Sequence, residues 1–126
     1  MKKATFAALD RQELKYAALL EGSGLSRSVA RTIVCLMVRR DLTVREIALA
    51  TQMSSALIGI ALRKLRDNGM VSIESANPGR MADRRYRLAG DWDRILAMVE
   101  ELEQEKVCRY LEKADRIRCD FQEKYG

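Results

Sequence analysis

Apolar residues recur at intervals of three and four positions along most of the chain, which is the spacing of amphipathic helices. The first such segment lies within residues 1–23 and ends at the sequence GSG, where glycine readily adopts the left-handed backbone angles that stop a helix. We therefore expect an N-terminal helix that packs one face on the rest of the chain. Its apolar positions are Phe6, Leu9, Leu14 and Leu20.

A second amphipathic helix is predicted to begin after Ser26, because a serine hydroxyl suits the N-cap position. It ends at two arginines and Asp41. Cys35 lies within its apolar stretch IVCLMV, so we expect this thiol in the core. The core-facing positions of the helix are Val29, Ile33, Leu36 and Met37.

A short third helix is predicted from a capping-box pattern. Thr43 and Glu46 are three residues apart, so that each side chain can bond the free backbone N–H of the other. Ile47 and Ala48 then face inward. The sequence TQMSS that follows reads as a turn.

The fourth helix is predicted to begin at a serine cap, either Ser54 or Ser55, and to end at Gly69. A glycine just past the last turn is a common helix stop because it accepts a positive φ. The buried stripe of this helix has the spacing i, i+3, i+4 and i+7. Its residues are Ile58, Ala61, Leu62 and Leu65.

After this glycine the apolar period changes to two. MVSIES alternates apolar and polar residues from Val71, and RRYRLAG alternates Tyr86 and Leu88 with arginines. The intervening ANPGRMAD contains Pro78 and reads as a basic turn, so the two segments form a β-hairpin. The predicted fold is therefore mainly α with a small β-hairpin: a winged helix-turn-helix domain with an N-terminal helix and a long C-terminal helix.

The last segment is one long helical pattern. Its apolar stripe runs to Leu102 and resumes one residue late at Val107, an offset that turns the face by about 100°. We therefore expect the helix to bend, break or switch partners near residues 104–106. The first half is expected to pack on its own domain and the second on a symmetry mate, because an apolar stripe far from a compact core needs cover. The expected dimer interface is Trp92, Ile95, Val99, Leu102, Val107, Tyr110, Leu111, Ala114, Ile117 and Phe121.

These patterns divide the chain into an N-terminal helix (1–23), a winged helix-turn-helix domain (24–90) and a C-terminal helical dimerisation element (91–126). The segment LTVREIALATQMSSALIGIALRKLRDNGMV resembles the helix-turn-helix of the MarR, ArsR and TrmB-like transcription regulators. The residues that carry this resemblance are the EIA helix, the serine-rich turn and the ending Leu-x-x-x-Gly-Met-Val. GLSRSVARTIVCL and NPGRMADRRYRL look most like the archaeal TrmB-like branch. The resemblance implies DNA binding through the fourth helix.

Charge is distributed unevenly along the chain. Residues 1–90 carry 16 Lys and Arg against 8 Asp and Glu, whereas residues 91–126 carry 7 against 10. A basic body with an acidic tail is typical of a polyanion-binding domain joined to a separate, non-binding element. Ordinary solvated surface is the alternative explanation of the same charges.

The fourth helix is unusual for a DNA reader because it offers Leu57, Gly59 and Ile60 where Arg, Asn, Gln or Ser is normal. The two aliphatic residues can contact thymine methyls in the major groove, or they can pack under the N-terminal helix or against a partner protein. Affinity is then expected to come mostly from phosphates, with Arg66 among the contributing cations and Arg80 placed to enter a minor groove. The predicted DNA-binding residues are Thr43, Arg45, Ser54, Ser55, Ala56, Leu57, Gly59, Ile60, Arg63, Lys64, Arg80, Arg84 and Arg85.

Other function classes find little support in the sequence. There is no histidine, glycine-rich phosphate loop or apolar carboxylate pair, so we expect no enzyme, cofactor or metal site. Cys108 and Cys119 share a helix face, and a redox role for them stays open as a minor alternative. No apolar run is long enough to span a membrane, and three cysteines fit a reducing compartment, so we expect a cytoplasmic protein.

The leading hypothesis is a homodimeric transcription regulator that binds double-stranded DNA. The alternative is a winged-helix module for protein–protein interaction with little or no sequence-specific DNA binding. Surplus arginines on the hairpin favour the first, and the apolar face of the fourth helix favours the second. The residues beyond position 90 contain no ligand-binding pattern, so no small-molecule effector is predicted.

Overall fold

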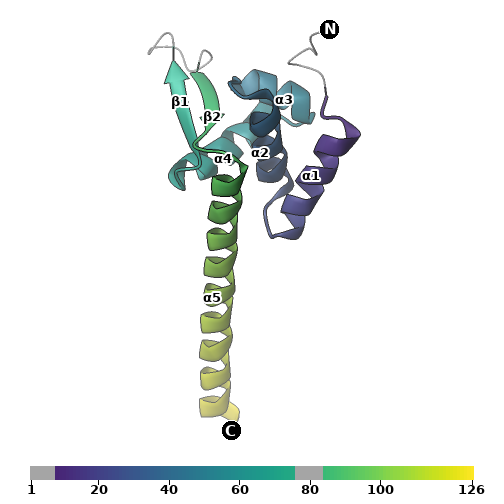
Figure 1. Ribbon diagram of the computed structural model, residues 1–126. Coiled ribbons are helices and arrows are strands. Elements are labelled where there is room, and N and C mark those ends of the chain that lie inside the picture. Colours follow the sequence, from purple (N-terminus) through teal and green to yellow (C-terminus); the bar gives the residue numbers. More distant parts are fainter. Residues whose placement is uncertain (1–7, 76–83) are drawn as a thin grey trace.

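The computed structural model describes residues 8–75 and 84–126. The elements follow the predicted order of helices and hairpin, and the domain is mainly helical with one two-stranded antiparallel sheet (Figure 1). The elements are α1 (Arg11–Gly22), α2 (Arg27–Arg39), α3 (Val44–Thr51), α4 (Ser55–Asp67), β1 (Val71–Ser75), β2 (Arg84–Leu88) and α5 (Trp92–Tyr125).

The predicted helix caps of α2, α3 and α4 are confirmed. Ser26 and Ser54 each accept a hydrogen bond from a backbone N–H of the first turn, and Thr43 forms a reciprocal capping box with Glu46. Past the end of α4, Gly69 has a φ of +70°, a conformation that suits glycine. The local hydrogen-bonding chemistry of these residues therefore sets the helix boundaries.

The predicted N-terminal helix begins later than expected. Asp10 caps α1 and forms a capping box with Glu13, so the segment before Arg11 is not helical over residues 8–10. Leu9 is buried but lies outside the helix, where its N–H donates to the Ala50 carbonyl oxygen of α3. Of the apolar residues of this helix, Leu20 is buried and Leu14 is 39% exposed. Phe6 lies outside the described residues.

The core is formed where α2 passes between the other helices and the hairpin (Figure 1). Ile33 of α2 and Ile47 of α3 are completely buried, as is the Cys35 thiol that was predicted to lie there. The four residues predicted as the buried stripe of α4 all belong to this cluster. The fourth helix is thereby held by one face only. These stripe residues are Ile58, Ala61, Leu62 and Leu65.

The hairpin is joined to the helical body at its base. In the antiparallel register Val71 pairs with Leu88 and Ile73 with Tyr86. Tyr86 also exchanges two backbone hydrogen bonds with Leu42, in the loop before α3, which adds a third short extended segment beside β2. The predicted turn, including Pro78 and Arg80, lies outside the described residues.

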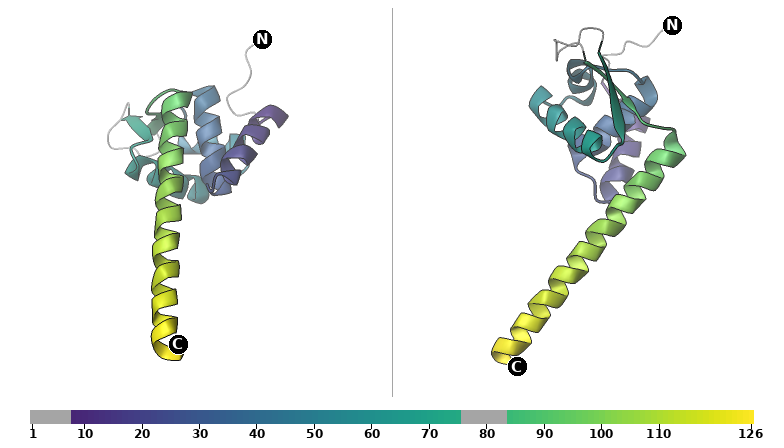
Figure 2. Two further views of the ribbon diagram at one scale, coloured as in Figure 1. Left: turned by 60° about the horizontal axis from the view of Figure 1, so that its bottom comes forward. Right: turned by 90° about the vertical axis from the view of Figure 1, so that its left-hand side faces the viewer.

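The long C-terminal helix is continuous from Trp92 to Tyr125, so of the bend, break or switch of partners expected near residues 104–106, the break is wrong. No glycine or proline interrupts this stretch, and the one-residue offset of the stripe is accommodated by a change of surroundings instead. The stripe before the offset packs on the body, and the stripe after it faces outward. Figures 1 and 2 show the distal part of α5 projecting well beyond the other elements.

The first three turns of α5 belong to the body. Ile95 and Val99 are buried in the common core, and the Trp92 ring packs edge-on against Tyr16 of α1 with centroids 6.4 Å apart. Further along, the Lys106 Nζ atom donates to the Gly24 carbonyl oxygen in the α1–α2 loop at 2.9 Å. Among the described helices, none has an apolar stretch of the length and character needed to cross a membrane.

Candidate nucleic-acid interface

One side of helix α4 is exposed to solvent along its length. With the buried stripe held in the core, Ser55, Ala56, Leu57, Ile60 and Arg63 are exposed, and Gly59 is partly exposed. This is the face that the sequence analysis predicted for DNA contact. Its orientation is fixed because the opposite side of the same helix is packed against α2 and α3.

Two aliphatic side chains stand on this exposed face. Leu57 is 45% exposed and Ile60 is 54% exposed. The interpretation in which they pack under the N-terminal helix is therefore wrong: their place is taken by Ile58 and Ala61, which point the other way into the core. Leu57 and Ile60 are available to a ligand outside the chain.

The N-terminal end of α4 is free of negative charge. Ser54 uses its Oγ atom to accept from the Leu57 N–H at 3.2 Å, which satisfies one of the free donors of the first turn. The first turn has no acidic residue, and Ser55 is exposed beside it. Unpaired N–H groups and the helix dipole together favour an anion such as phosphate at this end.

Four exposed cations lie on α3 and α4. Arg63, Lys64 and Arg66 are exposed on its C-terminal half, and Arg45 is exposed on the first turn of α3. These positions come from both helices of the helix-turn-helix unit. The exposed surface of this unit thus combines two aliphatic side chains with four cations and one exposed acid, Asp67, which suits a polyanion that also carries apolar groups.

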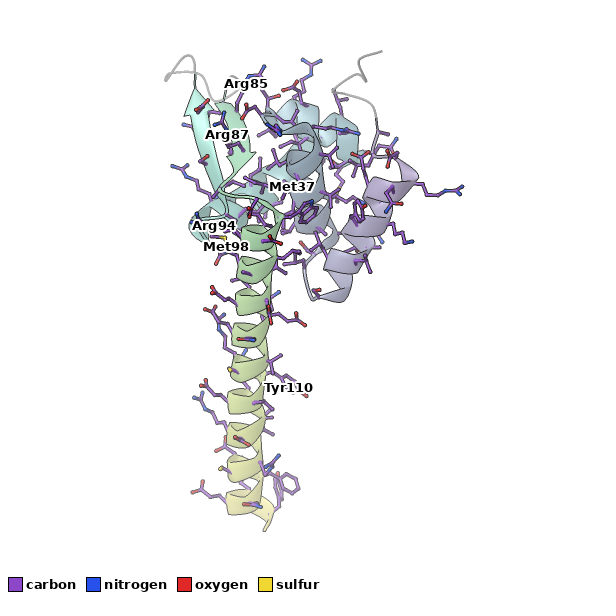
Figure 3. All side chains as sticks on the ribbon, viewed as in Figure 1. Met37, Arg85, Arg87, Arg94, Met98 and Tyr110 are labelled. Carbon is purple, nitrogen blue, oxygen red and sulfur yellow. The ribbon has the colours of Figure 1, made fainter. Side chains whose placement is uncertain are left out.

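The predicted hairpin residues differ in their surroundings. Arg85 of β2 lies 3.6 Å from the Glu46 carboxylate and donates to the Asp41 carbonyl oxygen at 3.4 Å. Glu46 itself caps α3 through Thr43, so the cap and the hairpin share one carboxylate. Arg84 is partly buried, and Arg80 lies outside the described residues. Figure 3 shows Arg85 and Arg87 along the second strand of the hairpin.

Arg87 fixes the hairpin, a role that was not predicted from the sequence. Its guanidinium donates to both carboxylate oxygens of Asp41, at 2.8 and 3.1 Å, and also approaches Glu74 of β1 at 3.5 Å. The hydrogen bonds from Arg87 hold the pKa of the Asp41 carboxyl below its ordinary value. The available signal was the alternation of arginines with Tyr86 and Leu88, but alternation alone does not identify the partner.

A buried ion pair was missed as well. Arg39 lies 3.2 Å from the Glu13 carboxylate, with both side chains more than nine-tenths buried, and it also donates to the Ala8 carbonyl oxygen. The sequence analysis treated Arg39 only as a residue that ends α2. The pair instead joins α1 to α2, and its role is structural.

The distal half of α5 carries the other predicted surface. From residue 103 onward every side chain is exposed except Ala114, which is partly buried by its own helix neighbours. Val107, Ile117 and Phe121 are each more than half exposed. Figure 3 shows Tyr110 on this distal half of α5, well away from the hairpin and the body. Ile95 and Val99 of the predicted interface fill their own chain's core and are not available to a second chain.

Similar folds occur among solved structures of transcription regulators. A crystal structure described as a transcriptional regulator matches with a TM-score of 0.59 and 19% identity, over 90% of this chain and 75% of that one. A MarR-family regulator from Silicibacter pomeroyi gives 0.52 and 16%, over 86% and 84%. Bordetella bronchiseptica BpsR, a protein whose DNA binding is regulated by 6-hydroxynicotinic acid, gives 0.52 and 14%, over 90% and 92%.

At the level of sequence, no protein-family model matches the chain. A search of curated proteins finds no significant match either. With identities below one in five, the likeness to MarR-family regulators is a likeness of fold. The winged-helix architecture predicted from the residues is confirmed, and the function is argued from the site itself.

Proposed function

We propose that this chain is a DNA-binding transcription regulator that acts as a homodimer, with α4 in the major groove and the basic hairpin on the backbone or in the minor groove. The single observation that carries this proposal is the exposed face of α4, whose first turn carries no acidic residue and whose other side is packed in the core. BpsR, a structural neighbour described by its DNA binding, adds support by analogy of fold.

Most of the affinity in this proposal comes from phosphates. Arg45, Arg63, Lys64 and Arg66 are exposed around α4, and the N-terminal end of this helix accepts an anion by its own dipole. Arg84 and Arg85 extend the positive surface along β2, and Arg80, outside the described residues, is proposed from the sequence as a further contact. Thr43, Ser54 and Ser55 add hydroxyl groups that can donate to phosphate oxygens.

The distal half of α5 is proposed as the dimerisation element. Its apolar positions after residue 103 repeat at three- and four-residue spacing, and a paired helix would remove them from water. Because Ile95 and Val99 belong to the body, we place the boundary of this element near residue 103 and not at 91. The surface left for a second copy is Val107, Tyr110, Leu111, Ala114, Ile117 and Phe121.

The placement among regulators rests on two levels of evidence. The fold supports a MarR-like winged helix, and the residues of EIA and RDNGMV support the same group. The archaeal TrmB-like affinity is proposed from the sequence motifs alone. A protein of this kind performs no catalysis and acts in the cytoplasm, where its DNA lies.

A second candidate function is a protein-interaction module. The exposed Leu57 and Ile60 favour it, since aliphatic side chains on a helix surface also suit a protein groove. This reading gives no role to the cations that border the same face.

An electrophoretic shift assay with a random duplex at low salt separates the two functions. DNA binding by the wild-type chain, weakened by Arg45→Ala and Arg63→Ala, supports the regulator. Lys15→Ala on α1 is the matched control, because it removes one exposed positive charge from a helix that belongs to neither the proposed DNA interface nor the proposed dimerisation element. Absence of a shift by correctly folded protein would contradict the regulator and favour the module.

A further inference from the structure

The exposed face of α4 lacks hydrogen-bonding side chains at its centre. Between Ser55 and Arg63, the residues with exposed or partly exposed surface are Ala56, Leu57, Gly59 and Ile60. None of these side chains can donate to or accept from a base edge. Direct readout by hydrogen bonds is therefore restricted to the two ends of the face.

In the major groove, thymine is the base that presents an apolar group, its C5 methyl. We propose that Leu57 and Ile60 read thymine methyls and so select A·T pairs at the centre of each half-site. This inference rests on the proposed function of the same helix. It assigns the specificity of the site to apolar contact and its affinity to the surrounding cations.

The backbone geometry of α4 supports close contact with the bases. A Cβ atom added at Gly59 would meet no other atom within 4 Å, so this glycine is not required by packing inside the chain. Gly59 has no side chain and Ala56 has a small one. The helix surface beside the two aliphatic side chains is therefore low, which allows the backbone to lie deep in the groove. A glycine in an exposed helix interior weakens the helix, and close approach of a ligand explains its presence.

The spacing of the two aliphatic residues fits neighbouring base pairs. Leu57 and Ile60 are three residues apart, which is a rise of about 4.5 Å along the helix. Successive bases along a strand are about 3.4 Å apart. Each aliphatic side chain can therefore contact the methyl of a different thymine in two adjacent A·T pairs.

The same contacts discriminate against G·C pairs. Guanine presents two acceptors and cytosine an amino donor to the major groove. An aliphatic side chain pressed against these groups removes them from water and offers no partner, which is unfavourable. Selection thus comes from both the methyl contact and the exclusion of unpaired polar groups.

Charge favours DNA over a protein as the occupant of this patch. The exposed charges of α3 and α4 are the cations Arg45, Arg63, Lys64 and Arg66 against the single acid Asp67 at the end of α4, and the N-terminal end of α4 adds the positive end of a helix dipole. A phosphate backbone on each side of a groove complements this excess of cations.

Replacement of thymine by deoxyuridine tests the proposal directly, because uracil lacks only the methyl group. The full-length protein is used to select its best duplex from a random pool, and affinities are compared for that duplex with thymine and with uracil. Wild-type protein is expected to bind the uracil duplex about fourfold more weakly for each contacted methyl. The Leu57→Ala/Ile60→Ala variant is expected to bind the two duplexes alike.

Leu19→Ala is the matched control, since Leu19 is an exposed leucine of α1 and should keep the full thymine preference. Thermal melting of each variant confirms that the exposed substitutions leave the fold intact. Equal wild-type affinity for both duplexes, with DNA binding retained, overturns this inference and leaves the proposed function standing. A thymine preference that survives in the double variant also overturns it. Failure of the wild type to bind any duplex at low salt overturns the proposed function itself.

Discussion

Arg87 of β2 holds Asp41 in a two-point contact, with its Nε and Nη2 atoms 2.8 and 3.1 Å from the two carboxylate oxygens. Asp41 lies in the loop between α2 and α3, so this contact ties the hairpin to the helix-turn-helix unit. Arg85 adds a second tie through Glu46 of α3. The position of the hairpin relative to α4 therefore depends on arginines that a simple DNA-binding account would assign to phosphates.

The substitution Asp41→Asn should loosen the hairpin without unfolding the domain. An amide can accept only one strong hydrogen bond from Arg87, and the ion pair is exposed, so we expect a small drop in melting temperature. Duplex affinity should fall more clearly than stability, because the hairpin cations are no longer held beside α4. Calorimetry and fluorescence anisotropy measure the two effects. A large loss of stability with unchanged affinity would contradict this role.

The same contact predicts a direction of pH dependence. The folded-state pKa of Asp41 is lowered, first by the hydrogen bond from Arg87, so the contact contributes stability above the ordinary carboxyl pKa. That contribution is lost as the pH falls through the lowered pKa of the folded state. Wild type and Asp41→Asn should therefore differ in melting temperature at neutral pH and converge under acid conditions. A difference that grows on acidification would refute this assignment.

Truncation after Glu103 should separate folding from assembly. This chain keeps Ile95 and Val99 in the core and removes the exposed half of α5, so we expect a folded monomer with nearly unchanged stability. Truncation after Gly90 should instead destabilise the body, because it removes both core residues. Light scattering with thermal melting measures both properties. A dimer that persists after truncation at Glu103 would place the interface elsewhere, and a monomeric chain of residues 1–126 would contradict the proposed dimer.

The three cysteines should differ in reactivity. Cys108 and Cys119 are exposed, whereas burial raises the pKa of the Cys35 thiol to about 11 from an ordinary value of 9.0. Alkylation of native protein near neutral pH should modify the first two and spare Cys35 until the chain unfolds. Mass spectrometry counts the modified thiols. Rapid modification of all three in folded protein would show that the core around α2 opens readily.

The raised pKa of Cys35 also affects stability in alkaline solution. The thiol stays protonated in the folded chain at a pH where it ionises in the unfolded chain. Its contribution to stability is therefore present below about pH 9 and declines towards pH 11, with a slope of at most about 1.4 kcal/mol per pH unit. The difference in unfolding free energy between wild type and Cys35→Ala isolates this effect. A constant difference across that range would contradict it.

Local sequence chemistry predicted much of the fold. Ser26, Thr43 and Ser54 were recognised as caps because a cap requires only neighbouring backbone groups. The buried stripe of α4 followed from helical periodicity in the same way. The start of α1 was misplaced. Asp10 and Glu13 form a capping box that marks it, but apolar residues before Asp10, such as Leu9, made the helical pattern appear to begin earlier.

Long-range contacts could not be predicted from periodicity. Arg87 and Asp41 are 46 residues apart, and Glu13 and Arg39 are 26 residues apart, so no local pattern relates them. The course of α5 was left open for a related reason. A change of apolar face is compatible with a bend, a break or a switch of partners, and the structure shows that it marks the point where α5 leaves the body. The exposed residues of α4 were predicted correctly because, once the buried side of a helix is known, the residues on its opposite side follow from helix geometry.

Phosphate contacts predict a defined effect of single arginines. Replacing Arg45 by alanine should weaken binding to specific and random duplexes about equally, because phosphates carry no sequence information. The salt dependence should also decrease by about one unit of slope. The matched control Lys15→Ala on α1 should leave both quantities unchanged. Loss of affinity for the specific duplex alone would instead indicate a base contact by Arg45.

The most direct test of DNA binding by this domain is the salt dependence of duplex affinity for the wild-type protein. Fluorescence anisotropy at several salt concentrations between about 50 and 200 mM gives the slope of the logarithm of the binding constant against that of salt. Binding through several phosphates predicts a steep, linear decrease across this range. A flat dependence, or no duplex binding even at the lowest salt, would contradict the assignment of the exposed α4 face to DNA.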